Sequence, residues 1–91
     1  MKRVLWNAEK NSWLKEQRGV AFEDVASRLE SHDLLDDIDH PNPGRYPGQR
    51  VFVVRIESYA CLVPYVQSED SLFLKTIIPS RKATRKYLRL V

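Results

Sequence analysis

Apolar residues follow a helical period in the first third of the chain. Between residues 22 and 29 they recur at i, i+3, i+4 and i+7, the spacing that makes one buried stripe on a helix, formed here by Phe22, Val25, Ala26 and Leu29. A thinner stripe precedes it, between Asn7, a good helix cap, and Gly19, the usual left-handed residue that closes a helix. We therefore expect two helices, 8–18 and 22–29, packed as a hairpin on a sheet.

The other apolar residues are grouped in strand-length segments. The candidate strands are 3–6, 34–38, 50–57, 59–66 and 72–78. The alternation is clearest in the third of these, where Phe52, Val54 and Ile56 share one face. Pro64 has no amide hydrogen to donate, so we expect its strand at a sheet edge or at a bulge. Two helices, a meander of three or four antiparallel strands and a final helix make an α+β domain.

A basic helix is predicted to close the chain. Pro79 interrupts the last apolar strand, and Ser80 can cap a new helix. Cations then recur every four residues along one face, with two more beside them, in the order Arg81, Lys82, Arg85, Lys86 and Arg89. Like charges at this spacing repel one another by roughly a few tenths of a kcal/mol per pair. A segment that tolerates this repulsion is suited to bind an anion, and phosphate is the obvious one.

Composition and charge narrow the class of protein. The 91 residues are enough for one small domain, 1–91, with a modest core. The net charge is +3, but the charges are unevenly distributed along the chain. Residues 75–91 hold six basic side chains and no acidic one, whereas residues 30–39 hold five acidic side chains and no basic one. A basic end of this kind favours nucleic acid or another anionic surface.

Cysteine usage and hydropathy indicate the compartment. Cys61 is the single cysteine, which excludes a disulfide framework and fits a reducing cytosol. No apolar run approaches the roughly 20 residues that a membrane span needs. We therefore expect a cytoplasmic protein that has no membrane partner.

The segment 40–48 is predicted to be an ordered loop, since it holds three prolines and two glycines in nine residues. Arg45 and Tyr46 could clamp a phosphate and stack a base of single-stranded RNA. Tyr46 could equally fold onto the prolines around it. His40 opens the loop and can titrate near neutrality, so it is a candidate general acid or base. The alternative is a histidine that caps a turn beside Asp39.

Other polar and aromatic residues carry weaker signals. Lys75 stands in an otherwise apolar strand, and it either reaches solvent at an edge or faces a site. Trp6 and Trp13 are more often core residues than platforms for bases, and Trp13 is expected to anchor the first helix. The acidic run that ends at His40 invites a metal, but without a second ligand cluster such a run is more often a solvated surface. We therefore expect neither a metal nor a cofactor.

Four short motifs, in this order along the chain, resemble those of a known family. They are Trp-x-x-x-Lys at 6–10, Gly-Val-x-Phe-Glu at 19–23, Arg-Tyr-Pro-Gly at 45–48 and Ile-Ile-x-x-Arg-x-Ala-Thr-Arg at 77–85. In this arrangement the chain resembles BrnT-type toxins over nearly its whole length. The resemblance implies a fold similar to the RelE group, membership of a type II toxin–antitoxin system, and a cognate antitoxin as partner.

The resemblance also implies an activity, the metal-independent endonucleolytic cleavage of messenger RNA, free or on the ribosome. Arg81 matches the family's terminal arginine. Thr76 stands where the family has a strand arginine, with Lys75 as the neighbouring cation. Ala21 stands where the family has a serine or threonine, so the second helix loses a cap worth about 1 kcal/mol.

RNA cleavage of this kind makes three chemical demands. The 2′-hydroxyl is the nucleophile, so the protein must help remove its proton, neutralise charge on the phosphorane and protonate the leaving 5′-oxygen. We assign these tasks to Arg81, Lys75 and His40, and RNA binding to Arg45, Tyr46, Arg50, Lys82 and Arg85. Arg81 could instead be a surface charge that pairs with the acidic segment. The alternative function is a non-catalytic module that binds RNA or an acidic protein through its basic helix.

Overall fold

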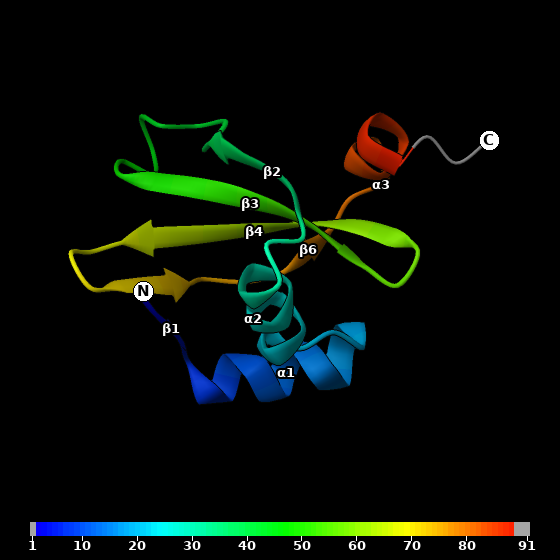
Figure 1. Ribbon diagram of the computed structural model, residues 1–91, viewed down its shortest axis with the longest axis horizontal. Coiled ribbons are helices and arrows are strands. Elements are labelled where there is room, and N and C mark those ends of the chain that lie inside the picture. Colours follow the sequence, from blue (N-terminus) through cyan, green and yellow to red (C-terminus); the bar gives the residue numbers. More distant parts are fainter. Residues whose placement is uncertain (1, 89–91) are drawn as a thin grey trace.

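The computed structural model describes residues 2–88 and places helices on both faces of one mixed sheet (Figure 1). In chain order the elements are β1 (Arg3–Trp6), α1 (Ala8–Arg18), α2 (Phe22–Glu30), β2 (Leu34–Asp39), β3 (Gln49–Ile56), β4 (Tyr59–Gln67), β5 (Ser71–Leu74), β6 (Ile78–Pro79), α3 (Arg81–Ala83) and a continuing π-helical turn, η1 (Thr84–Leu88). We call α3 and η1 together the C-terminal helix. No helix within residues 2–88 is long and apolar enough to cross a membrane.

The sheet differs from the predicted antiparallel meander. Its strand order is β1-β5-β4-β3-β2, and β6 pairs with β4 as well. The α+β class is confirmed, but the expected count of three or four strands is wrong, because the sheet has six. The expectation of purely antiparallel pairing is also wrong, because β1 runs parallel to β5 with Leu5 opposite Phe73. Parallel neighbours need a long crossover, which α1, α2 and the intervening strands supply here.

The segment 72–78, predicted as one strand, is divided into two. β5 pairs with the end of β4 near Tyr65, whereas β6 pairs with Cys61 and Leu62. Between them the amide of Lys75 donates to the carbonyl of Pro64 at 2.8 Å. The chain therefore leaves β4 after Lys75 and rejoins it at Ile78.

This break explains why Pro64 can occupy a central strand, where we had predicted an edge or a bulge. In an antiparallel ladder the N and O atoms of one residue point toward the same neighbouring strand. The carbonyl of Pro64 faces Lys75, so its nitrogen also faces the break between β5 and β6. The missing amide hydrogen therefore removes no bond to β3, and only the return bond to Lys75 is lost.

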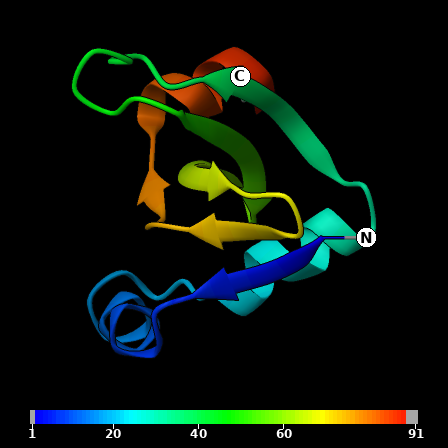
Figure 2. The same cartoon turned by 90° about the vertical axis from the view of Figure 1, so that its left-hand side faces the viewer.

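The helix pair α1 and α2 and the C-terminal helix lie on opposite sides of the sheet (Figure 2). Two apolar clusters hold these layers together, one on each face of the sheet. The larger cluster lies under α1 and α2, and its most buried members are Leu14, Phe22, Val25, Val54, Val63, Leu74 and Ile77. The smaller cluster joins Val53 and Ala60 of the strands to Ala83 of the C-terminal helix. We call these two sides the hairpin face and the C-terminal-helix face.

The two tryptophans have different surroundings. Trp6 packs against the larger cluster and stacks on Phe22 with ring centroids 5.7 Å apart, as expected for a core residue. Trp13 is 41% exposed, so its predicted role as a core anchor of α1 is wrong. The Lys10 ammonium and the Arg18 guanidinium lie 4.2 Å and 4.9 Å from its ring, so these long cationic side chains pack against it.

A buried amide in α1 supplies the cap that α2 lacks in its own sequence. Asn7 caps α1 and Gly19 ends it in the left-handed conformation, as predicted. Ala21 has no side-chain cap to offer, but Asn11 Oδ1 accepts a hydrogen bond from the amide of Phe22 at 2.8 Å. Asn11 Nδ2 in turn donates to Glu23 Oε1 at 2.8 Å. One side chain thus starts the second helix and fixes it against the first.

Candidate functional site

The C-terminal helix is fastened to the sheet near both of its described ends. Ser80 Oγ accepts from the amide of Ala83 at 3.0 Å, which confirms the predicted N-cap. Thr84 Oγ1 accepts from the amide of Ala60 at 2.9 Å, so the first turn is bonded directly to β4. Tyr87 donates to Asp36 Oδ2 at 2.7 Å, and this hydrogen bond lowers the pKa of Asp36 below its usual value. The helix is therefore a fixed platform.

The outward side of this platform carries the predicted cations. Arg81, Lys82, Arg85 and Lys86 are all exposed. No ion pair within residues 2–88 joins any of them to a carboxylate. The alternative that Arg81 pairs with the acidic segment, residues 30–39, is therefore not found within residues 2–88. Arg89, the last predicted member of the row, lies outside the described residues.

Carboxylates of the acidic segment bond to residues of β3 and β4 instead. Arg50, predicted to bind RNA, donates through Nε to Asp37 Oδ1 at 3.3 Å and through Nη1 to Asp39. Asp37 also accepts from the Tyr65 hydroxyl at 2.8 Å. These groups stand on the hairpin face, since Tyr65 belongs to the cluster under α1 and α2. The structure thus separates Arg50 from the cations of the C-terminal helix.

Three predicted residues do gather in the loop between β2 and β3. The rings of His40 and Tyr46 lie 4.5 Å apart, and the Arg45 guanidinium lies 5.6 Å from the Tyr46 ring. His40 Nδ1 accepts from the amide of Asn42 at 3.0 Å, as in the alternative that made His40 a turn cap. The loop and α3 stand toward opposite ends of the sheet (Figure 1). The structure therefore does not bring His40 beside Arg81.

Lys75 lies in the break between β5 and β6. Its side chain is exposed and its ammonium lies 5.6 Å from the Phe73 ring, which is on the C-terminal-helix face. The neighbouring Thr76 differs from it, because its hydroxyl oxygen is buried and has no hydrogen-bond partner among residues 2–88. Lys75 is therefore the outward cation at this point, on the same side of the sheet as the C-terminal helix.

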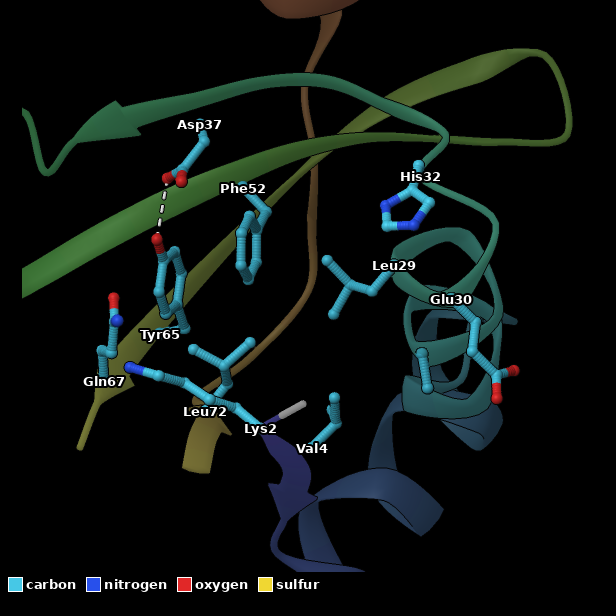
Figure 3. A pocket seen from close by; sticks show the side chains of 11 residues that line it. Lys2, Val4, Leu29, Glu30, His32, Asp37, Phe52, Tyr65, Gln67 and Leu72 are labelled. Carbon is cyan, nitrogen blue, oxygen red and sulfur yellow. Dashed lines mark hydrogen bonds between the residues drawn. The ribbon is translucent and has the colours of Figure 1, made fainter. Parts of the chain in front are cut away.

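A cavity of about 360 Å³ on the hairpin face was not foreseen from the sequence (Figure 3). Its back wall includes Phe52 and Tyr65, whose rings stack with centroids 3.8 Å apart. Polar groups lie around this apolar interior, among them Lys2, His32 and Asp37. Strand alternation predicted that Phe52 points inward, but no local signal could show that an uncovered end of the sheet lies beside α2.

Two buried acids in the sheet have raised pKa values. Burial raises the pKa of the Cys61 thiol to about 11. Burial, together with the hydrogen bond to Asp37, raises the pKa of Tyr65 to about 12. Cys61 is thus a packed thiol, protonated at neutral pH, rather than a nucleophile.

These two pKa values predict how stability depends on pH. The folded protein keeps both protons at a pH where the unfolded chain has begun to lose them, from near 9 for Cys61 and near 10 for Tyr65. The free energy of unfolding should therefore fall as the pH rises through this range to about 12. Thermal melts followed by circular dichroism would measure this, with Cys61→Ala plus Tyr65→Phe as the comparison. An equally steep fall in the double variant would contradict the assignment.

Residues 2–88 contain no group of three histidine, cysteine, aspartate or glutamate side chains placed to hold a metal ion. The chain matches no family model, no curated protein and no solved structure. The resemblance to BrnT-type toxins stays a prediction drawn from the motifs themselves.

Proposed function

We propose that the chain is the toxin of a type II toxin–antitoxin system and that it cleaves messenger RNA. The observation that carries the proposal is the row of exposed cations on the C-terminal helix, which has no ion-paired carboxylate among residues 2–88. Cations that the protein does not neutralise itself are free to bind phosphates. Arginines add a planar fork that matches two phosphate oxygens.

In this proposal Arg81 and Lys75 meet the phosphate to be cleaved. The 2′-oxygen attacks phosphorus as its proton passes to water, and the bond to the 5′-oxygen breaks as that oxygen takes a proton from water. The products are a 2′,3′-cyclic phosphate and a 5′-hydroxyl. Fixed cations stabilise the charge that builds on the phosphorane. Lys82 and Arg85 hold the flanking phosphates.

In the proposal His40 is not a general acid or base, and the loop residues bind RNA instead. His40, Arg45 and Tyr46 lie together at the other end of the sheet from α3 (Figure 1). We therefore assign them to a distant part of the RNA, where a ring and a guanidinium can stack on bases. Arg50 would contribute indirectly, because it is already bonded to two aspartates.

The arrangement of helices supports a RelE-like assignment as part of the same proposal. Two N-terminal helices cover one face of the sheet, and a short basic helix covers part of the other. The same proposal includes a cytoplasmic location, a cognate antitoxin, and no cofactor.

One observation favours a second candidate, an RNA-binding module that does not cleave. The chain has two histidines, and neither belongs to the C-terminal helix, since His32 lines the cavity and His40 lies in the loop. The cations therefore lack a neighbouring side chain that ordinarily titrates near neutral pH. Binding would need no such group.

Induced expression of the chain alone in bacteria separates the two candidates. Growth and transcript integrity would be followed in the same cultures. The toxin proposal expects growth to stop as transcripts are cut. Normal growth with intact transcripts, in cells where the protein is present and folded, would favour the binding module.

RNA cleavage by the purified chain should survive a chelator. The proposed chemistry uses the 2′-hydroxyl and fixed cations, so EDTA is expected to leave the rate unchanged. End-group analysis should find a 2′,3′-cyclic phosphate or the 3′-phosphate formed from it. Loss of activity in EDTA with recovery in magnesium would instead indicate metal-assisted cleavage.

A further inference from the structure

Most of the exposed large apolar side chains lie on one side of the sheet. Within residues 2–88 there are five of them, and all but Trp13 belong to strands. Leu5 is opposite Phe73 in the β1–β5 pair, and Phe73 is opposite Val66 in the β5–β4 pair. These three residues, each 37–38% exposed, form a continuous line across three strands that we call the apolar row. Ile78, 40% exposed, lies further along the same side.

Strand alternation fixes which side this is. The chain neighbours Trp6, Leu74 and Tyr65 belong to the core under α1 and α2. The apolar row must therefore point to the opposite face, where the C-terminal helix lies. That helix packs over Val53 and Ala60 and leaves the row exposed.

Two cations flank the apolar row. Arg3 stands two residues before Leu5 on β1, and Lys75 lies with its ammonium 5.6 Å from the Phe73 ring. Asp36 is the one carboxylate that the strands of residues 2–88 place on this face, and it already accepts a hydrogen bond from Tyr87. Glu69 and Asp70 lie in the exposed turn between β4 and β5, beside Arg3, whose amide donates to the Asp70 carbonyl. No ion pair within residues 2–88 joins a carboxylate to Arg3 or Lys75, so the face combines apolar anchors with cations that are not ion-paired.

We propose that the apolar row is a docking surface for a partner protein, and that the partner contributes a segment of aliphatic or aromatic side chains flanked by carboxylates. The apolar contacts would supply most of the affinity, and the charges would speed the encounter. The identification of this partner as an antitoxin rests on the proposed function. A segment seated here and extended toward the C-terminal helix would cover Lys75 and Arg81 and so block RNA.

Two other occupants fit the row less well. RNA would need rings or guanidinium planes for its bases, yet two of the three members are aliphatic. A second copy of this chain would bring two copies of this cation-bearing face together, since a two-fold interface places one patch on itself. An acidic and apolar protein segment matches both the cations and the apolar side chains of this face.

The test begins with random peptides displayed on phage and selected on the intact chain. The enriched peptides should combine acidic with apolar residues. A synthetic copy of one of them should bind the parent protein and lose about tenfold in affinity for Phe73→Ser and for Arg3→Glu, each a loss of about 1.4 kcal/mol. Trp13→Ser, which removes an exposed aromatic residue on α1, is the matched control and should bind normally.

Other results would overturn the proposal. These are failure to enrich any peptide, enrichment of basic peptides, or equal affinity for all the folded variants. A fall in RNA affinity rather than peptide affinity in Phe73→Ser would assign the row to RNA, and self-association lost in Leu5→Ser would assign it to a second copy. RNA cleavage should persist in Phe73→Ser, so a failure of docking and a failure of the proposed function can be told apart.

Discussion

Replacing Arg81 with alanine is expected to slow RNA cleavage about a hundredfold while leaving the fold intact. Arg81 is exposed and opens the C-terminal helix, and no carboxylate among residues 2–88 pairs with it. In the proposed function its removal deletes one contact to the charged transition state, worth about 3 kcal/mol. Single-turnover cleavage of a labelled RNA would measure the rate, and a thermal melt would confirm the fold.

Two further variants make this prediction specific. Arg81→Lys keeps the charge but loses the planar fork, so an intermediate rate is expected. Arg28→Ala removes an arginine of α2 that pairs with Asp33 at 3.0 Å, and it should cleave at the parental rate. If Arg81→Ala and Arg28→Ala cleave equally fast, the phosphate contact has been assigned to the wrong residue.

Replacing Asn11 with alanine should lower the free energy of unfolding by about 2 to 3 kcal/mol. Asn11 is 6% exposed, and its amide satisfies both the Phe22 amide and the Glu23 carboxylate. Without it, a buried N–H at the start of α2 has no acceptor. Urea denaturation followed by circular dichroism would give the difference.

Asn7→Ala is the matched comparison for this variant. Asn7 is exposed and caps α1 by accepting from the amide of Lys10 at 2.8 Å. Water can replace this bond, so the expected loss is about 1 kcal/mol. Equal losses in Asn7→Ala and Asn11→Ala would show that the buried amide does not join the two helices.

The limits of α1 and the buried stripe of α2 could be predicted from residues a few positions apart in the sequence. Asn7 and Gly19 bound α1 where the sequence predicted, and the apolar stripe of α2 lies in the core. The cap of α2 was not predictable, because its acceptor, Asn11, comes from another helix. Helix limits depend on residues a few positions apart, whereas such a bond depends on how two helices pack.

The pairing of strands in the sheet could be predicted only in part. Alternation identified β3 and β4, whose register is set by a tight turn. The pairing of β1 with β5 joins segments that lie far apart in the sequence, and neither strand has a residue pattern that identifies the other as its partner. The end of β5 lies beside Pro64, whose carbonyl accepts from the Lys75 amide, and this contact also joins residues on different strands.

The candidate site could also be predicted only in part. Four-residue spacing predicted the cations of the C-terminal helix, and Arg81, Lys82 and Arg85 are exposed on it. The partners of Arg50 and the distance of His40 from Arg81 follow from the order of strands in the sheet, which the sequence did not reveal. The apolar row likewise becomes visible only once β1, β5 and β4 are placed side by side.

Cleavage of a single-stranded RNA by the purified chain, beside the same RNA carrying 2′-O-methyl groups, tests the central claim most directly. The methyl groups remove the nucleophile and leave the phosphates and bases in place. We predict that the unmodified RNA is cut and that the methylated RNA binds but stays intact. If the unmodified RNA also stays intact with the folded protein in excess, the chain does not cleave RNA in the way proposed.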